Sequence, residues 1–239
     1  ALTALIGNRA LAGTFSGTLT LFDSLQTVSV TPFTRTLAAN DSTTVALSLP
    51  SIGAGRHPLR LVLQTAGDED STNDVRTLLL TAGYPARTLL INELMYTPPS
   101  GSPEWMELIN VGPDTVPLAG WRVSDAGTTK ALLLPSSLRL APRSYLVVTT
   151  DTNAFRSAYE GDVPLAQASF SALNNSGEAA VLYDATLSVI DSLSFTSQWG
   201  GTAGRSLERI DTAALSALQS NWSGSLSADG STPGMSNSV

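Results

Sequence analysis

Three glutamates and a tryptophan lie close together in the segment INELMYTPPSGSPEWMELIN, which spans residues 91–110. The glutamates are Glu93, Glu104 and Glu107, and Trp105 stands between the last two. Acidic pairs beside an aromatic ring are typical of glycosidases and of metal-dependent hydrolases. In such enzymes one carboxyl group has a raised pKa, and both converge on an accessible cleft. The segment contains the acids but gives no indication of a cleft.

Two predicted strands must position these acids. LLINELMY and WMELIN each alternate between two sets of side chains, as strands do. The intervening TPPSGSP carries three prolines, which cannot donate the hydrogen bonds of a sheet, so this stretch is a loop. Residues 89–110 are therefore expected to form two strands that flank a loop.

This arrangement places Glu93 and Glu107 on largely apolar strand faces. A buried carboxylate without a partner is costly, so each is expected to have one. The candidates are Arg205 and Arg209 in GRSLERID, or backbone N–H groups. We therefore interpret both glutamates as structural residues and expect no catalytic residue among them.

Nucleophilic catalysis lacks its usual residues. The chain has no cysteine, and its one histidine, His57, stands in GAGRHPL directly before Pro58. No Ser-His-Asp arrangement and no G-x-S-x-G motif can be assembled from the sequence. We expect His57 to be an exposed turn residue, and we predict neither a catalytic nor a cofactor-binding site.

The acidic stretch GDEDSTND, residues 67–74, is the candidate metal site. It supplies Asp68, Asp70, Asn73 and Asp74, together with Glu69. Oxygen ligands on a loop are what calcium prefers, although the spacing does not match the EF-hand. The alternative is a polar hairpin loop whose charges keep it soluble. No other cofactor is expected.

Short alternating segments predict an all-β fold. TFSGTLTLFD, STTVALSLP, HPLRLVLQTA and VRTLLLTAG follow one another with turn residues between them, which is the spacing of a β-sandwich. In STTVALSLP, Val45, Leu47 and Leu49 form one face, and Leu59, Leu61 and Leu63 do so in the next segment. Asp151 and Asp211 look like the N-caps of short helices.

The stretch AGYPART, residues 82–88, is the best candidate for a linker. All four tryptophans follow it, and the charge changes across it. Up to Arg87 there are six acidic and six basic residues, whereas beyond it there are fourteen acidic and seven basic ones. We therefore expect two tandem β-sandwich domains, at residues 1–86 and 87–239.

Composition bears on localisation and partners. No apolar run approaches the roughly 20 residues of a membrane span, and residues 1–13 do not read as a signal peptide but as an internal stretch of a longer protein. Charged residues make up 14% of the chain, a low share that suits extracellular all-β domains. The net charge of −7 argues against contacts with nucleic acid phosphates.

The second domain resembles the lamin tail domain, an immunoglobulin-like β-sandwich found in nuclear lamins and in exported bacterial proteins. Nine segments from about residue 88 to the end carry this resemblance, with the tryptophans in register. Trp105 and Trp121 are expected in its core. The segments are LLINELMY, EWMELIN, LAGWRVSD, LRLAPRSYLVVTTD, LNNSGEAAVLYD, VIDSLSFTSQW, GRSLERID, NWSGS and STPGMSN.

The first domain is similar to an immunoglobulin-like adhesion-type (CARDB-like) module, found in tandem in bacterial and archaeal surface proteins. GNRALAGTFSGTLTL, LAANDSTTVALSLP and GRHPLRLVLQTAGDEDSTNDVRT carry this similarity. Relative to such modules the first strand looks short or missing. An edge left open in this way would accept a neighbouring domain or subunit.

These observations lead us to expect a non-catalytic structural or interaction module of an exported bacterial protein, extracellular or at the cell surface. Its partners would be proteins, neighbouring domains or further copies bound through edge strands, with no nucleic acid and no membrane insertion. One alternative is an accessory binding domain of a secreted nuclease or phosphoesterase. Another is a carbohydrate-binding sandwich that uses an exposed Trp199.

Overall fold

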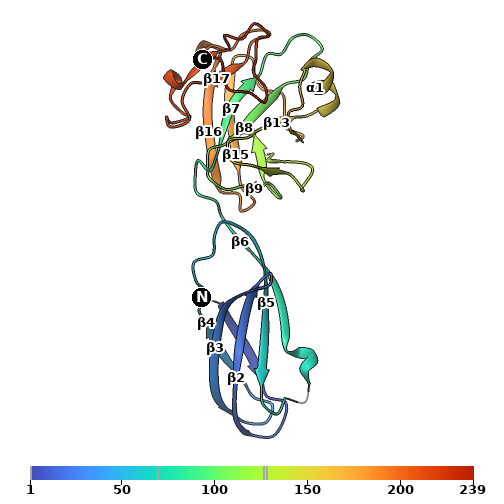
Figure 1. Ribbon diagram of the computed structural model, residues 1–239, viewed down its shortest axis with the longest axis vertical. Coiled ribbons are helices and arrows are strands. Elements are labelled where there is room, and N and C mark those ends of the chain that lie inside the picture. The colour runs from blue at the N-terminus through green and yellow to red at the C-terminus, as the bar shows by residue number, and fades with distance from the viewer. Residues whose placement is uncertain (1, 69, 126, 128) are drawn as a thin grey trace. The chain divides into compact units, whose positions relative to one another are not determined.

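The computed structural model describes residues 2–68, 70–125, 127 and 129–239 (Figure 1). The chain divides into two compact units, Ala1–Ala82 and Gly83–Val239. The division lies inside AGYPART, four residues before the expected boundary at residue 86. Both units are built mainly from β-strands, which confirms the all-β class.

In the first unit two antiparallel sheets contribute to one core. One sheet has the order β3-β2-β5-β6, and the other pairs β1 with β4. A short 3-10 helix, η1 (Ser71–Asn73), precedes β6. The strands are β1 (Leu2–Gly7), β2 (Gly13–Asp23), β3 (Gln26–Leu37), β4 (Ser42–Leu47), β5 (Gly55–Thr65) and β6 (Val75–Ala82).

Alternation supplies the core of this unit. Val45 and Leu47 of β4 are buried together with Leu19 of β2 and Phe33 of β3. Strand β4 ends at Leu47, so the predicted third member of its apolar face, Leu49, lies beyond it. The sequence did not mark β3 as a strand because its pattern is weak: it is rich in threonine, and most of its side chains are exposed.

In the second unit a core lies between two larger sheets. One sheet has the order β14-β13-β8-β7-β17-β18, and the other has the order β11-β10-β15-β16. The pair β9 and β12 adds a short ribbon. The strands of the first sheet are β7 (Leu89–Met95), β8 (Trp105–Asn110), β13 (Tyr145–Thr149), β14 (Leu165–Gln167), β17 (Leu207–Arg209) and β18 (Trp222–Gly224). The remaining strands are β9 (Val116–Pro117), β10 (Arg122–Ser124), β11 (Ala131–Leu132), β12 (Arg139–Leu140), β15 (Gly177–Tyr183) and β16 (Val189–Thr196).

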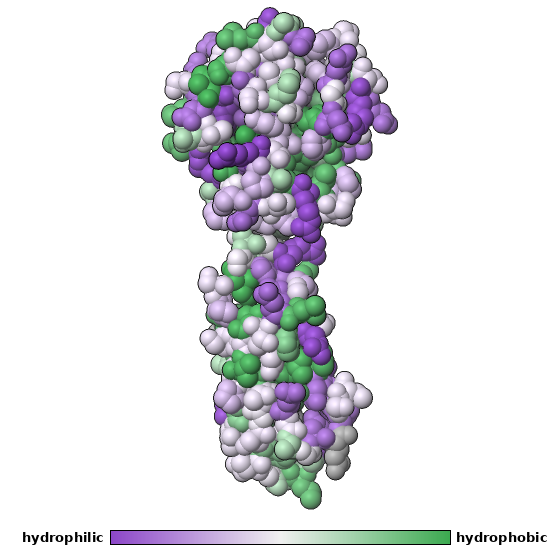
Figure 2. Space-filling model, viewed as in Figure 1, coloured by the Kyte–Doolittle hydropathy of each residue, from purple (hydrophilic) through white to green (hydrophobic). Residues whose placement is uncertain are grey.

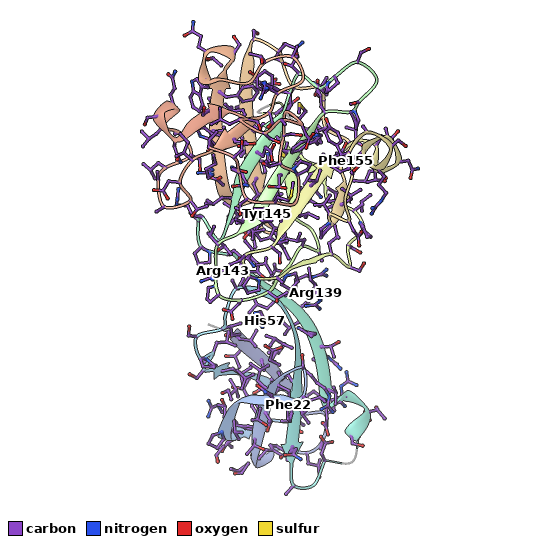
Figure 3. All side chains as sticks on the ribbon, turned by 45° about the horizontal axis from the view of Figure 1, so that its top comes forward. Phe22, His57, Arg139, Arg143, Tyr145 and Phe155 are labelled. Carbon is purple, nitrogen blue, oxygen red and sulfur yellow. The ribbon has the colours of Figure 1, made fainter. Side chains whose placement is uncertain are left out.

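The two predicted strands around TPPSGSP correspond to β7 and β8, which pair antiparallel. Every residue of β7 is buried. Both faces of this central strand are therefore covered. One face packs into the core between the sheets, and other segments of the second unit cover the outer face. Part of the outer cover is α1 (Thr152–Ala158), which carries Phe155 (Figure 3). The Phe155 ring packs edge-on against Trp105, with ring centroids 5.9 Å apart.

Helix α1 begins where the sequence predicts. The Asp151 side chain accepts hydrogen bonds from the N–H groups of Asn153 and Ala154, each at 2.9 Å. The expected helix after Asp211 is wrong: this aspartate accepts only from Ala213 N–H, and residues 211–218 form turns. Two further 3-10 turns are η2 (Ser197–Trp199) and η3 (Gln219–Asn221). Among the described residues, no helix has the length and apolarity needed to cross a membrane.

Replacing Asp151 with alanine is expected to lower the free energy of unfolding of the second unit by about 1 kcal/mol, because two helix N–H groups lose their acceptor. Denaturant titration followed by tryptophan fluorescence measures this change, since all four tryptophans lie in the second unit. Asp162→Ala is the matched control. Asp162 is fully exposed, and its ion pair with Arg156, at 3.9 Å, lies at the surface, where such pairs contribute little to stability. Equal losses in the two variants would contradict the capping role.

Candidate functional site

Three glutamates from neighbouring strands lie in a row across the sheet of the second unit. Glu107 of β8 is directly opposite Glu93 of β7, and Glu93 is directly opposite Glu208 of β17. All three are 0% exposed. Like charges directly opposite one another destabilise a sheet, so this row requires protons or donors around it.

A bulge in β7 determines which face the row occupies. The pairing register of β7 shifts between Ile91 and Glu93. Ile91 and Leu94 belong to the core between the sheets, whereas Trp105 belongs to the outer cluster under α1. Because side chains alternate, Glu93 (next to Leu94) and Glu107 (two residues from Trp105) point away from the core. The row therefore lies on the outer face of the sheet.

Residues 231–238, named the strap below, cover the row. Thr232 N donates to Glu93 Oε1 at 2.9 Å, and Gly234 N donates to Glu107 Oε2 at 2.5 Å. Ser238 N donates to Glu208 Oε2 at 2.6 Å. Each glutamate thus accepts one backbone N–H from the strap. Figure 1 shows the C-terminal end of the chain beside β17, in agreement with these contacts.

A tight turn gives the strap its shape. Pro233 and Gly234 occupy its central positions, and Met235 N donates to Thr232 O at 3.0 Å. Gly234 has a φ of +78°, as the third residue of a type II turn requires. A Cβ atom at this glycine would also lie 2.8 Å from a methyl carbon of Val163. The turn directs its two N–H groups toward Glu93 and Glu107.

The Thr232 hydroxyl links two of the glutamates. Its oxygen lies 3.2 Å from Glu93 Oε2 and 3.0 Å from Glu208 Oε1. A hydroxyl has one proton, so it can donate to one of these carboxyl groups only. The other contact becomes a hydrogen bond when that carboxyl group is itself protonated. The geometry therefore accommodates a proton on Glu93, with the hydroxyl donating to Glu208.

The pKa values of the row agree with the presence of protons on its carboxyl groups near neutral pH. Burial raises the pKa of Glu93 to about 7, against the opposing effect of its donors. Burial, with the charge of Glu93, raises the pKa of Glu107 to about 8. Among the described residues, no arginine, lysine or histidine lies within ion-pair distance of the row. Near neutral pH the row therefore holds protons in place of cationic partners.

Carboxyl groups with raised pKa values beside an aromatic ring also fit the hydrolase hypothesis. The two interpretations differ in whether a substrate can reach these carboxyl groups. The three side chains are fully buried, and the strap contacts each of them. A hydrolase has to bring both carboxyl groups to its substrate. In the arrangement described here the row offers them to the strap instead.

The expected arginine partners are wrong for both glutamates. Arg209 points to the opposite face, where its Nη2 lies 3.1 Å from Asp191 Oδ2 and 2.6 Å from Ile91 O. Burial lowers the pKa of Arg209 to about 10. Arg205 is exposed and donates through Nη1 to Ser225 O at 2.7 Å. The alternative partners, backbone N–H groups, are the ones that the structure provides.

The two tryptophans that were expected in the core are both 0% exposed. Trp121 lies between the sheets, with its ring centroid 5.3 Å from that of Tyr84. Trp105 lies in the outer cluster with Phe155. Glu104, the third acid of the opening segment, is separate from the row: it is half-buried, and its Oε2 accepts from Leu173 N at 2.5 Å.

The acidic loop of the first unit uses its oxygens locally. Asp70 caps η1 and accepts from Thr72 N at 3.2 Å and from Asn73 Nδ2 at 3.0 Å. Asp68 accepts from Asp70 N at 3.0 Å, and Glu69 lies outside the described residues. Burial and the neighbouring Asp68 raise the pKa of Asp74. The described residues contain no group of three or more histidine, cysteine, aspartate or glutamate side chains arranged to hold a metal ion. Calcium binding by Asp68, Asp70, Asn73 and Asp74 stays a prediction.

His57 is a strand residue, contrary to the exposed turn that was expected. It lies in β5, where Nδ1 is 2.6 Å from Asp23 Oδ2 and Nε2 is 2.9 Å from Gly53 O. Figure 3 labels it on this strand. Pro58 follows it without interrupting the sheet, because this end of β5 pairs only with β6.

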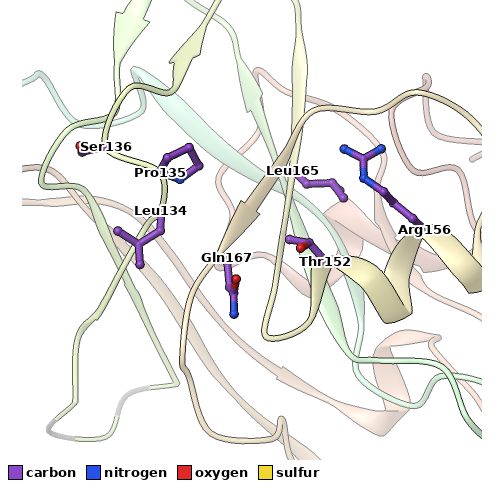
Figure 4. A pocket seen from close by; sticks show the side chains of 7 residues that line it. All are labelled: Leu134, Pro135, Ser136, Thr152, Arg156, Leu165 and Gln167. Atoms are coloured by element: carbon purple, nitrogen blue, oxygen red, sulfur yellow. The ribbon is translucent and has the colours of Figure 1, made fainter.

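A surface pocket of about 570 Å³ lies elsewhere in the second unit, near α1 and β14 (Figure 4). It has no aromatic lining residue on which a sugar ring could stack. Trp199, the candidate for sugar binding, is half-buried and packs against the core. The carbohydrate-binding hypothesis required an exposed tryptophan, and none of the four tryptophans is exposed. The pocket is lined by Leu134, Pro135, Ser136, Thr152, Arg156, Leu165 and Gln167.

Sequence reasoning missed Glu208 and the strap. Glu208 stands between two residues of GRSLERID that were taken for arginine partners of other acids. The signal that could have found it is parity: next to Arg209 in a strand, it must point to the opposite face. The Thr-Pro-Gly of the strap is a turn signal, but nothing local shows that the turn meets residues 139 positions earlier.

Two of the three comparisons with known proteins give a match. Residues 82–197 match the model of the family described as Lamin Tail Domain. The crystal structure of a DUF4876 family protein from Bacteroides thetaiotaomicron VPI-5482 aligns over 94% of this chain and 92% of its own, with 10% identity and a TM-score of 0.34. No curated protein matches the chain.

The family match supports the resemblance of the second unit to the lamin tail domain, an immunoglobulin-like and non-catalytic type of domain. It begins at the linker and includes Glu93 and Glu107, whereas Glu208 and the strap lie beyond residue 197. The similarity of residues 1–86 to an adhesion-type (CARDB-like) module is not confirmed.

Proposed function

We propose, taking the lamin tail domain match as the premise, that the chain is a non-catalytic interaction and spacing module of an exported bacterial protein. Its place would be outside the cell or on the cell surface, where it presents or anchors neighbouring parts of a larger assembly. The buried glutamate row favours this proposal over an enzyme, because its acids are engaged with the strap. The low share of charged residues, 14%, agrees with an extracellular setting.

The observation that carries the proposal is the edge of β1 in the first unit. β1 pairs with β4 along one edge, and no described strand pairs with its other edge. Leu2, Ala4 and Ile6 face the core of the unit but are only partly buried. An edge of this kind offers unpaired backbone groups beside uncovered apolar side chains, and an extended segment can add there as a further strand.

The rest of the first unit agrees with an incompletely covered core. Leu61 and Leu63 of β5 also pack against the core while remaining partly exposed. Figure 2 shows apolar side chains interspersed with polar ones at the surface of this unit, on the face displayed. An added strand would cover apolar area and complete backbone pairing together. We propose that its source is a second copy of the chain or an adjoining domain.

The charge distribution supports a protein partner better than a nucleic acid. The part of the chain beyond Arg87 has fourteen acidic and seven basic residues. Contacts to phosphates need a basic face, and their number sets the salt dependence of binding. Strand addition relies on main-chain hydrogen bonds instead and needs no net charge of either sign.

The test places a lysine on the edge strand. Leu5 of β1 is 73% exposed, so Leu5→Lys leaves the core intact while its charge opposes pairing of a further strand. We expect the wild type to associate as concentration rises, and Leu5→Lys to weaken this association about tenfold, which corresponds to about 1.4 kcal/mol. Sedimentation velocity over a concentration series measures the effect.

Leu25→Lys is the matched control. Leu25 lies in the turn between β2 and β3 and is 96% exposed, so the same substitution there should leave association unchanged. Hydrogen exchange of the β1 amides provides a second readout, because amides on an open edge exchange quickly. A chain that stays monomeric while all its β1 amides are protected would contradict the proposal.

A further inference from the structure

We propose that the strap is a proton-dependent latch: it stays closed over the glutamate row while the row holds its protons, and it opens locally when the row loses them. This inference concerns the second unit alone and does not depend on the β1 edge. It rests on three features of the structure. These are the arrangement of the acids, the contacts that hold the strap, and the charges that surround both.

The acids are arranged so that ionisation of one affects the next. Glu93 is the middle member of the row, and its pairing positions face Glu107 on one side and Glu208 on the other. In a buried position the charged form of a carboxyl group loses its hydration. A second and a third charge in neighbouring positions add repulsion to that loss.

The row holds the strap at both the Thr-Pro-Gly turn and Ser238. Three of its backbone N–H groups donate hydrogen bonds to the three glutamates. These are the N–H groups of Thr232, Gly234 and Ser238. The hydroxyls of Thr232 and Ser238 also donate to the row, the latter to Glu208 Oε2 at 2.8 Å. A change of charge at the row therefore acts directly on the contacts of the Thr-Pro-Gly turn and on those of Ser238 with Glu208.

The other hydrogen bonds of the strap involve Asn237 and Ser238, near its end. Asn237 Nδ2 donates to Asn92 O at 3.1 Å and to Arg209 O at 2.7 Å. Ser238 Oγ accepts from Leu226 N at 2.7 Å. These contacts can hold the end of the strap while the Thr-Pro-Gly turn leaves the row.

No cation offsets the row in the part of the chain that the structure describes. The strap has no charged side chain. Under α1, the titratable group that responds to Glu93 is the phenol of Tyr159, whose pKa is raised first by burial. On the side of residues 225–227, Arg205 donates to Ser225 O and Ser227 O rather than to an acid. Arg209 is paired on the opposite face with Asp191.

The direction of the pH effect follows from the raised pKa values. An ordinary glutamate has a pKa of 4.5, whereas Glu93 and Glu107 are raised to about 7 and about 8. These raised pKa values mean that the closed form binds protons more tightly than a row of solvated glutamates with ordinary pKa values would. Its stabilisation is complete below pH 4.5 and is lost as pH rises through about 7 and 8. Alkaline conditions open the latch.

Hydrogen exchange of the strap amides measures the opening. Rates for residues 232–238, corrected for the intrinsic effect of pH, are compared at about pH 5.5 and 8.5. Each carboxyl group that releases a proton on opening raises the opening constant about tenfold per pH unit within its window. We expect protection in the wild-type strap to fall at least about 100-fold. Protection in β15 and β16 should stay unchanged.

Glu93→Gln is the diagnostic variant. Its amide oxygen accepts from Thr232 N, and its NH₂ group donates to the Thr232 hydroxyl, which then donates to Glu208. The side chain thus keeps the contacts that protonated Glu93 makes with Thr232 but cannot ionise. The fall in strap protection should be at least about tenfold smaller than in the wild type. Glu160→Gln, at an exposed position, is the matched control and should behave as the wild type.

The same protein provides a second readout if Glu93→Gln does not fold. The carboxyl ¹³C shifts of wild-type Glu93 and Glu107 should titrate near pH 7 and 8. Midpoints near 4.5 for both residues would overturn the proposal. So would strap protection that is independent of pH, or that falls equally in the wild type and Glu93→Gln. Loss of protection in β15 and β16 at the same pH would show global unfolding and would also overturn it.

Discussion

Arg209→Met is expected to lower the free energy of unfolding of the second unit by about 3–5 kcal/mol. Arg209 is 2% exposed, and the substitution leaves the buried carboxylate of Asp191 without its cation. It also removes the donors of Ile91 O, a carbonyl at the β7 bulge that Arg209 Nε and Nη2 contact at 2.8 and 2.6 Å. Denaturant titration followed by tryptophan fluorescence gives the loss.

Arg205→Met is the control for this result. Arg205 donates to two carbonyl groups from an exposed position, so its loss should cost less than about 1 kcal/mol. Adding Asp191→Leu to Arg209→Met should recover part of the stability, since no buried charge is then left alone. A loss below about 1 kcal/mol in Arg209→Met alone would show that Asp191 is satisfied by its other donors, Ile91 N and Ser216 Oγ.

Trp121→Ala is expected to cost the second unit about 3–5 kcal/mol. Its ring is 0% exposed in the core between the sheets, and it contacts Tyr84 of the segment that follows the unit boundary. Removing it leaves a cavity that neighbouring strands cannot close without losing their pairing. Both the denaturant midpoint and the melting temperature should fall, with fluorescence from the three remaining tryptophans as the signal.

Trp199→Ala is the matched control for the tryptophan. Trp199 is half-buried at the edge of the same core, so its removal should cost about 1–2 kcal/mol. Equal losses at the two positions would mean that the core around Trp121 collapses onto the vacated space. That outcome would contradict the rigid packing inferred for the strands on either side.

Local patterns in the sequence were sufficient for the strands and for burial of the acids. Alternation in LLINELMY and WMELIN, with the prolines between them, predicted β7, β8 and the loop, and placed Glu93 and Glu107 on covered faces. The same rule predicted β4 and β5, in which Val45 and Leu59 are buried. These features depend on a few neighbouring residues, so a single sequence contains them.

Partners across the sheet could not be predicted, because they depend on register. Glu208 and Arg209 are adjacent, and strand geometry sends one to the outer face and the other to the core. Which of them meets Glu93 is decided by the pairing of β17 with β7. A register one residue different would have brought Arg209, one of the candidate partners, to Glu93.

His57 shows the complementary limit. A histidine followed by a proline after a glycine-rich stretch is typical of a turn. β5 nevertheless begins at Gly55. Its first residues pair with β6 on one side only, so the proline at position 58 does not prevent strand formation. Asp23, the partner of His57, comes from the end of β2, at a distance of 34 positions in the chain. Local propensity favoured the turn, and tertiary pairing overrode it.

The separation between the strap and the row has a consequence for how the second unit is made. Thr232 follows Glu93 by 139 positions, so during synthesis the acids leave the ribosome long before the residues that cover them. Contacts between such distant positions form slowly, since a long loop must close first. Until then the nascent sheet carries an uncovered acidic row on one face. Completion of the second unit therefore waits for the arrival of its final turn, whichever strands have paired before it.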